Sequence, residues 1–130
     1  MASEAVIDLV RDYLELLNRE GFHVYRAVLF GSQARGEPRA DSDIDILITS
    51  PDFEQLTWTQ EEKLWALTAR LDTRLEPIAC GESRWRNDDV SPLIEAARRE
   101  GIVINIDPHA LPYPAQLEWR TLAQAAEISI

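Results

Sequence analysis

The fold depends on residues 30–47, which read FGSQARGEPRADSDIDIL and join two apolar runs. Gly31 has no side chain, so the backbone can approach a ligand closely, and Ser32 adds a hydroxyl and an N–H at an expected helix start, where anions are favoured. Asp43 and Asp45 flank Ile44 at strand spacing, so both carboxylates project from one face. This arrangement suits magnesium, which is usually held by one or two carboxylates plus substrate phosphates.

Alternating helical and strand-like segments predict an α+β (α/β) fold with about four strands flanked by helices. The expected helices are 4–19, a short turn at 32–35, a helix from a capping box at Thr59 and Glu62 to about Asp72, and a helix from Ser91-Pro92 to Gly101. The expected strands are 24–30, 44–49, 74–79 and 102–106, the last a candidate edge strand. Residues 81–90 are largely polar and are expected to form an exposed loop, in which Trp85 is a candidate partner contact.

The bulk composition predicts one domain at residues 1–107, followed by a Pro-rich connector and a helical tail at 108–130. Apolar residues make up 45% and charged residues 28%, as in soluble globular proteins, and no apolar run is long enough to span a membrane. The first residues lack a signal-peptide pattern, so a cytoplasmic location is expected. Cys80 is the single cysteine and cannot form an internal disulfide.

The net charge of −10 argues against DNA or RNA as the main partner. Binding a polyanion by counterion release needs clustered Lys and Arg, whereas the basic residues here are scattered along the chain. A nucleotide held through a metal ion remains compatible with an acidic protein.

The pattern Gly31-Ser32-x-Ala34-Arg35-Gly36, followed by Ser42-Asp43-x-Asp45, resembles the signature of the DNA polymerase β-like nucleotidyltransferase superfamily. The resemblance is greatest to its small stand-alone members, the minimal nucleotidyltransferases. It implies the nucleotidyltransferase fold with a mixed sheet, and transfer of a nucleoside monophosphate from ATP or another NTP to a hydroxyl group. The implied cofactor is Mg²⁺, with two ions in the site.

The resemblance also implies that three carboxylates are catalytic and hold the metal ions. Asp43 and Asp45 match the first two. The third acid is expected on a later strand, where Glu76 matches best because it lies centrally on the strand after the capped helix, with Asp72 as the alternative. A carboxylate close to other carboxylates has a raised pKa, so Glu76 is also suited to accept the proton of the nucleophile.

The phosphates of the nucleotide are expected to bind on the other side of the motif. The resemblance assigns the leaving phosphates to Gly31 and Ser32. Arg35 is a further candidate for a phosphate contact, although its guanidinium can equally pair with Glu37 or Asp41.

Minimal nucleotidyltransferases often act beside a small helical protein of the HEPN type, in a toxin–antitoxin pair where the nucleotidyltransferase modifies and silences the toxin. The resemblance therefore implies an antitoxin that adenylylates a HEPN-type partner protein. Two alternatives remain open: a catalytically silent module of the same fold that binds its partner, and a small-molecule (antibiotic) nucleotidyltransferase, for which the tail after Pro108 is short. The sequence leaves the acceptor, the preferred base and the oligomeric state open.

Overall fold

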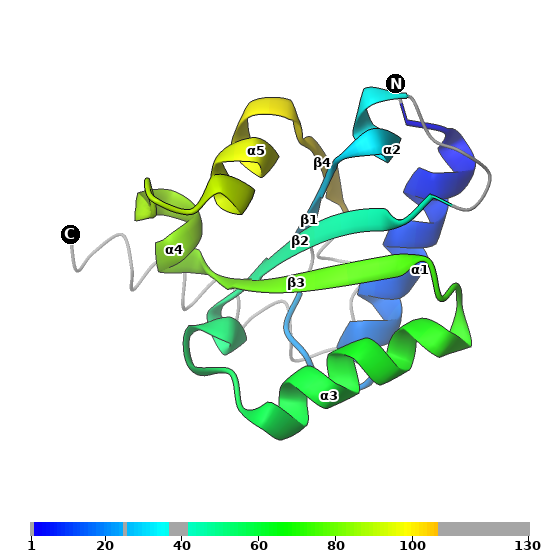
Figure 1. The fold of residues 1–130 in the computed structure, drawn as a ribbon. Helices are drawn as coiled ribbons and strands as arrows, with labels where there is room; N and C mark the ends of the chain where they lie inside the picture. The colour runs from blue at the N-terminus through cyan, green and yellow to red at the C-terminus, as the bar shows by residue number, and fades with distance from the viewer. Residues whose placement is uncertain (1, 25, 37–41, 107–130) are drawn as a thin grey trace.

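The computed structural model describes residues 2–24, 26–36 and 42–106, which form a sheet with helices on both faces (Figure 1). The helices are α1 (Glu4–Arg19), α2 (Ser32–Arg35), α3 (Trp58–Ala66), α4 (Glu82–Asn87) and α5 (Pro92–Glu100), with 3-10 helices at Pro51–Gln55 and Leu67–Arg70. The strands are β1 (Arg26–Phe30), β2 (Ile44–Ser50), β3 (Leu75–Gly81) and β4 (Ile102–Asn105). The expected domain boundary at residue 107 and the tail at 108–130 lie outside the described residues.

The sheet is mixed, with strand order β3-β2-β1-β4. Strand β1 is antiparallel to β2 and β4, while β2 and β3 are parallel and are connected through α3, as a parallel pair requires. The expected four-stranded mixed sheet is confirmed, and β4 is an edge strand as expected. Because β2 and β3 run in the same direction, their first residues lie at the same end of the sheet.

One face of the sheet is covered by α1 and α3. Helix α1 begins where Ser3 Oγ accepts a hydrogen bond from the Val6 N–H at 3.2 Å, which satisfies one of its unpaired first-turn donors. The buried side of α1 joins the inward-facing residues of all four strands in one apolar cluster. Tyr13 ties the two helices together because its hydroxyl donates to the Leu64 carbonyl at 2.5 Å.

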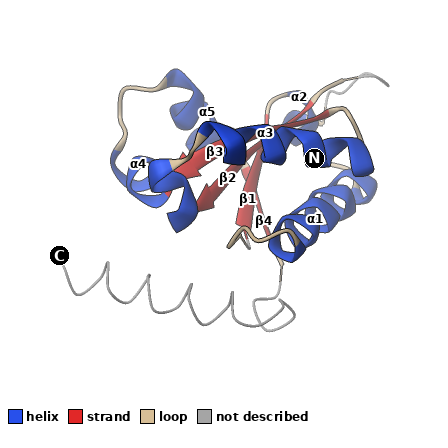
Figure 2. Ribbon diagram, turned by 90° about the horizontal axis from the view of Figure 1, so that it is seen from below, coloured by secondary structure: helices blue, strands red, loops and turns tan. Residues whose placement is uncertain are grey.

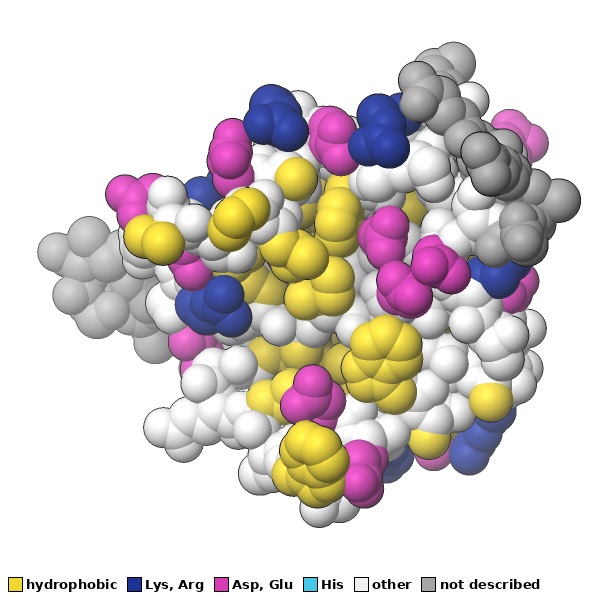
Figure 3. All heavy atoms as spheres, in the orientation of Figure 1, with side chains coloured by type: hydrophobic (Ala, Val, Ile, Leu, Met, Phe, Trp, Pro, Cys, Tyr) yellow, Lys and Arg dark blue, Asp and Glu magenta, His cyan; other side chains and the backbone are white. Residues whose placement is uncertain are grey.

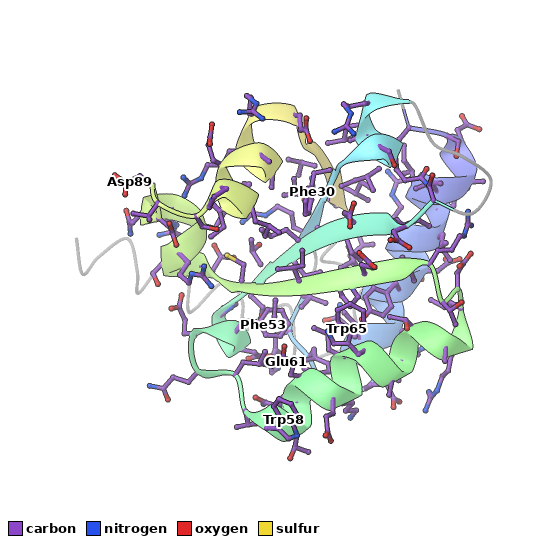
Figure 4. All side chains as sticks on the ribbon, in the orientation of Figure 1. Phe30, Phe53, Trp58, Glu61, Trp65 and Asp89 are labelled. Carbon is purple, nitrogen blue, oxygen red and sulfur yellow. The ribbon has the colours of Figure 1, made fainter. Side chains whose placement is uncertain are left out.

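The opposite face is covered by α5, with α4 beside it. Figure 2 shows the strands between α1 on one side and α4 and α5 on the other. Helix α5 starts at Ser91, whose Oγ accepts from the Ile94 N–H, with Pro92 in its first turn. Figure 4 shows the difference between the faces: Phe30 lies on the side of α2 and α5, while Phe53 and Trp65 lie on the side of α3.

The start and end of α3 differ from the expectation. The capping box is formed by Thr57 and Gln60, two residues earlier than the expected pair of Thr59 and Glu62. Thr57 Oγ1 accepts from the Gln60 N–H at 3.2 Å, and Gln60 Oε1 accepts from the Thr57 N–H at 2.9 Å. The chain is still extended at Leu56 and Thr57, which makes Thr57 the N-cap. The α-helix ends at Ala66 and continues to Arg70 as a 3-10 helix.

The expected exposed loop at 81–90 is wrong in part, because residues 82–87 form α4. The carboxylate of Glu54 accepts from both the N–H and the hydroxyl of Ser83, each at 2.7 Å, and so satisfies a first-turn donor of the helix. At the other end, the guanidinium of Arg98 donates to carbonyls of α4, including that of Trp85, and lies 5.6 Å from the Trp85 ring. Trp85 is half-buried and packs within the chain.

Two further observations concern membrane-spanning helices and the single cysteine. No helix in the described part of the chain is long and apolar enough to cross a membrane. Cys80 is a free, buried thiol on β3, and burial raises its pKa.

Candidate active site

The start of β2 and β3 brings acidic side chains together. The strand register places Asp45 opposite Phe30 of β1 on one side and opposite Glu76 of β3 on the other. Asp43 is exposed and lies just before β2, whose first residue is anchored by a hydrogen bond from the Ile44 N–H to the Arg74 carbonyl at 2.8 Å. Figure 3 shows acidic side chains gathered in this region of the surface.

Glu76 has the perturbed acid–base chemistry expected of this cluster. Its pKa is raised to about 7, chiefly because its carboxyl group hydrogen-bonds to the carboxylate of Asp45, and further by partial burial and by the charges of Asp43 and Asp45. Neighbouring carboxylates cannot all carry full charge at close range without a large repulsion. A proton on Glu76 relieves that repulsion, and a bound cation would relieve it in the same way.

Gly31 is required here for two separate reasons. Its φ is +74°, in the left-handed region that disfavours residues with a side chain. A Cβ at this position would also lie 2.5 Å from Asp45 Oδ2, far inside contact distance. The Gly-Ser turn therefore lies directly against one of the carboxylates.

Gln33 holds the turn in place and was not identified from the sequence. Its side chain is buried, and its Nε2 donates to the Ser42 carbonyl at 3.4 Å, which links α2 to the entrance of β2. Ser32 next to it is half-buried. A glutamine in a polar stretch usually faces solvent, so the pattern gives no signal for this role.

Arg35 contacts a residue that the sequence did not indicate. Its Nη1 lies 3.1 Å from Glu100 Oε1, and the same oxygen accepts from the Gly31 N–H at 3.4 Å. Glu100 is the last residue of α5 and is 65 positions away along the chain, which no local pattern can reveal. The alternative partners Glu37 and Asp41 lie outside the described residues.

The geometry also separates the two candidates for the third acid. Asp72 forms an ion pair with Arg74, with Arg74 Nη2 at 2.8 Å from Asp72 Oδ2, and hydrogen bonds from Arg74 hold the pKa of Asp72 below its usual value. Glu76, in contrast, lies beside Asp45. The role of either residue as a metal ligand stays a prediction.

The donor set fits a hard divalent cation. Carboxylate oxygens are the ligands that Mg²⁺ prefers, and the mutual repulsion of Asp43, Asp45 and Glu76, which raises the pKa of Glu76, favours a cation at this cluster. Within residues 2–24, 26–36 and 42–106, no three His, Cys, Asp or Glu side chains form a ready-made metal cage. Mg²⁺ usually completes its coordination shell with water and substrate phosphates, so a full protein cage is not required.

Comparison with known families agrees with this geometry. The sequence profile of the family described as "Nucleotidyltransferase domain" matches residues 8–103. The match covers most of the chain and includes the Gly-Ser turn and the acidic residues. The protein belongs to the nucleotidyltransferase domain family, of the DNA polymerase β-like type. No curated protein matches the chain significantly.

Solved structures share the fold at low sequence identity. A Sulfolobus solfataricus protein assigned as a nucleotidyltransferase matches with a TM-score of 0.53 and 16% identity, over 76% of this chain and 78% of the other. A toxin–antitoxin complex with AMP-PNP matches with a TM-score of 0.53 and 17% identity, over 95% and 90% of the two chains. A mutant of the toxin–antitoxin MntA-HpeT matches with a TM-score of 0.48 and 16% identity, over 99% and 92%. The first likeness shows that the fold is that of nucleotidyltransferases.

Proposed function

We propose that this protein is a magnesium-dependent nucleotidyltransferase that transfers AMP from ATP to a hydroxyl group of a partner protein, as the antitoxin of a HEPN-type toxin–antitoxin pair. One observation carries the chemical part of the proposal. Asp45 and Glu76 are paired on adjacent strands, and the Gly-Ser turn directly follows Phe30, the β1 residue that pairs with Asp45. Groups suited to phosphate, metal and proton transfer therefore meet at one point.

Each group has a distinct task in this reaction. The acceptor oxygen forms a bond to the α-phosphorus, the bond from that phosphorus to the bridging oxygen of pyrophosphate breaks, and pyrophosphate leaves with the electron pair. Glu76 takes the proton of the acceptor hydroxyl, as a carboxylate positioned beside Asp45 at the reacting centre. Gly31 and Ser32 hold the leaving phosphates.

Asp43, Asp45 and Glu76 are the residues that would hold Mg²⁺. The ion supplies neutralisation of the phosphate charge and polarisation of the reacting oxygens. The exposure of Asp43 at the strand entrance leaves its carboxylate accessible to an incoming metal-bound nucleotide.

The partner part of the proposal rests on different support. A structure with the same fold is a toxin–antitoxin complex that contains AMP-PNP. The net charge of −10 favours association with a basic partner, which electrostatic complementarity would accelerate. A HEPN-type protein is the expected acceptor.

The decisive experiment measures AMP-PNP binding by calorimetry, with and without Mg²⁺, for the wild type and Asp45→Asn. We expect binding only with Mg²⁺ and a loss of about a hundredfold or more in the variant, because it lacks a charge at the point where the metal and phosphates meet. Asp8→Asn is the matched control, since Asp8 is an exposed aspartate of α1 paired with Arg11. Unchanged binding by Asp45→Asn would disprove the metal site.

Transfer is tested separately with ATP labelled at the α-phosphate and a HEPN-type protein as the candidate acceptor. We expect label on the partner, and none when the label is on the γ-phosphate. Magnesium-dependent nucleotide binding without any label transfer would support the silent binding module instead.

A further inference from the structure

Glu100 contacts Gly31, which the proposed function assigns to the phosphates, and Arg35, a further candidate for a phosphate contact. Its Oε1 accepts from the backbone N–H of Gly31 at 3.4 Å and lies 3.1 Å from Nη1 of Arg35. The Glu100 side chain is 25% exposed, compared with 46% for Arg35. One carboxylate oxygen thus bridges the turn and the arginine expected to contact phosphates.

The position of Glu100 in its helix makes this contact notable. Acidic side chains are disfavoured in the last turn of a helix because the macrodipole is negative there, and the neighbouring Arg98 and Arg99 follow the usual preference. Glu100 therefore gains little from its own helix. Its contacts with Gly31 and Arg35 offset that unfavourable placement.

The chain after Glu100 fixes it in this place. A Cβ on Gly101 would lie 2.1 Å from the Ala97 carbonyl oxygen and 2.3 Å from Val28 Cγ1, so this position has no room for a side chain. The close approach brings the end of α5 against β1, the strand that leads into Gly31. Backbone packing consequently holds the end of α5, which carries Glu100, close to the turn.

We propose that Glu100 competes with the triphosphate of the nucleotide for Gly31 and Arg35 and thereby weakens nucleotide binding. The inference rests on the proposed function of the same site and adds its regulation. A carboxylate and a phosphate oxygen are both anionic acceptors, so the Gly31 N–H and the Arg35 Nη1 that face Glu100 cannot serve both in the same geometry. Binding of the triphosphate requires the Glu100 side chain to withdraw. The free energy of its two lost contacts makes the free energy of nucleotide binding less favourable.

A merely structural role for Glu100 predicts the opposite result. If the carboxylate served to hold Arg35 in a phosphate-binding position, its removal would weaken nucleotide binding. The sign of the change in affinity therefore separates competition from positioning.

The test compares AMP-PNP binding with Mg²⁺ for the wild type and Glu100→Gln by calorimetry. Gln keeps the size of the side chain and removes the charge, and we expect the dissociation constant to fall by about three- to tenfold. The gain should shrink at high salt, because an exposed charge interaction is screened. Glu95→Gln is the matched control, since it removes a charge from the same helix at an exposed ion pair with Arg99.

Two additional probes locate the competition. Tripolyphosphate with Mg²⁺ should bind Glu100→Gln more tightly than the wild type by the same factor as AMP-PNP. Adenosine should bind both proteins equally, because the carboxylate competes with phosphates alone. The gain should also be smaller when Arg35→Gln is introduced, since one of the two disputed donors is then absent.

Each result decides the matter. Equal or weaker AMP-PNP binding by Glu100→Gln, in a protein whose binding depends on Mg²⁺ and Asp45, would overturn the inference and leave the proposed function in place. Binding by Glu100→Gln alone would support the inference in its strongest form. No binding by either protein would overturn both the inference and the nucleotide site.

Discussion

The two faces of the sheet differ in what covers them and in what they do. The face toward α1 and α3 contributes to a cluster of twenty buried residues, which includes side chains from all four strands. The face toward α5 has a cluster of six: Val28, Phe30, Leu47, Cys80, Ile94 and Ala97. Asp45 is two residues from Leu47, and Glu76 is four residues from Cys80. Residues at even spacing on a strand share one face, so both acids belong to this second, less covered face.

The site lies on the side of the sheet that has fewer buried apolar residues. Most of the apolar burial that stabilises the fold is concentrated on one side of the sheet, which leaves the start of β2 and β3 on the other side accessible to a ligand. The clustered carboxylates repel one another, and the larger core is the part of the molecule that offsets their cost.

Truncating a side chain in the larger core should cause the greatest loss of stability. Leu14→Ala on α1, where the side chain is fully buried, should lower the free energy of unfolding by about 4 kcal/mol. Ile94→Ala on α5 is the matched substitution on the other face, and should cost about 2 kcal/mol because the short helix can shift into the space. Urea unfolding of both variants measures the two losses, and equal losses would show that the faces contribute alike.

Gly31→Ala tests the contact between the turn and Asp45. The new Cβ would lie 2.5 Å from Asp45 Oδ2, so magnesium-dependent AMP-PNP binding should be lost. Gly21→Ala is the control: its φ of +103° costs about 1 kcal/mol in backbone strain, but nothing lies within 4 Å of the added Cβ, so binding should persist. The idea fails if both variants bind nucleotide equally well.

Glu76→Gln should give the smallest change in stability, and it should stabilise the protein, whereas the core substitutions destabilise it. Because the pKa of Glu76 is raised to about 7 in the folded protein, the folded state holds more protons than the unfolded state between about pH 4.5 and pH 7, and the stability due to this group falls as pH rises through that window. At pH 8 without Mg²⁺ the variant should melt about 3 °C above the wild type, since Gln carries no charge.

The same variant should lose transfer activity while remaining folded. Below about pH 4 the melting difference should vanish, because Glu76 is then protonated in both the folded and the unfolded wild type. A lower melting temperature for Glu76→Gln at pH 8 would show that the carboxylate stabilises the fold and is not under repulsion.

Much of the fold could be predicted from local pattern. The helix at Glu4–Arg19 and the strands around the motif follow directly from apolar periodicity, and the mixed sheet followed from the resemblance. Errors arose where two local signals competed: Thr57 and Thr59 both precede a residue able to close a capping box, and only the path of the preceding chain decides between them. In α4, long-range capping by Glu54 and Arg98 stabilises a helix that polar composition alone does not indicate.

The sequence alone identified the first residues of the site: a glycine and a serine after one apolar run, and paired aspartates at the start of the next. Those residues are local, and their spacing along a strand sets which way they point. Only the tertiary structure decided which later acid joins Asp45, because strand register places Glu76 beside it while Arg74 engages Asp72. Only the tertiary structure also brought Glu100 to the turn, because helix packing joins residues that no sequence pattern connects.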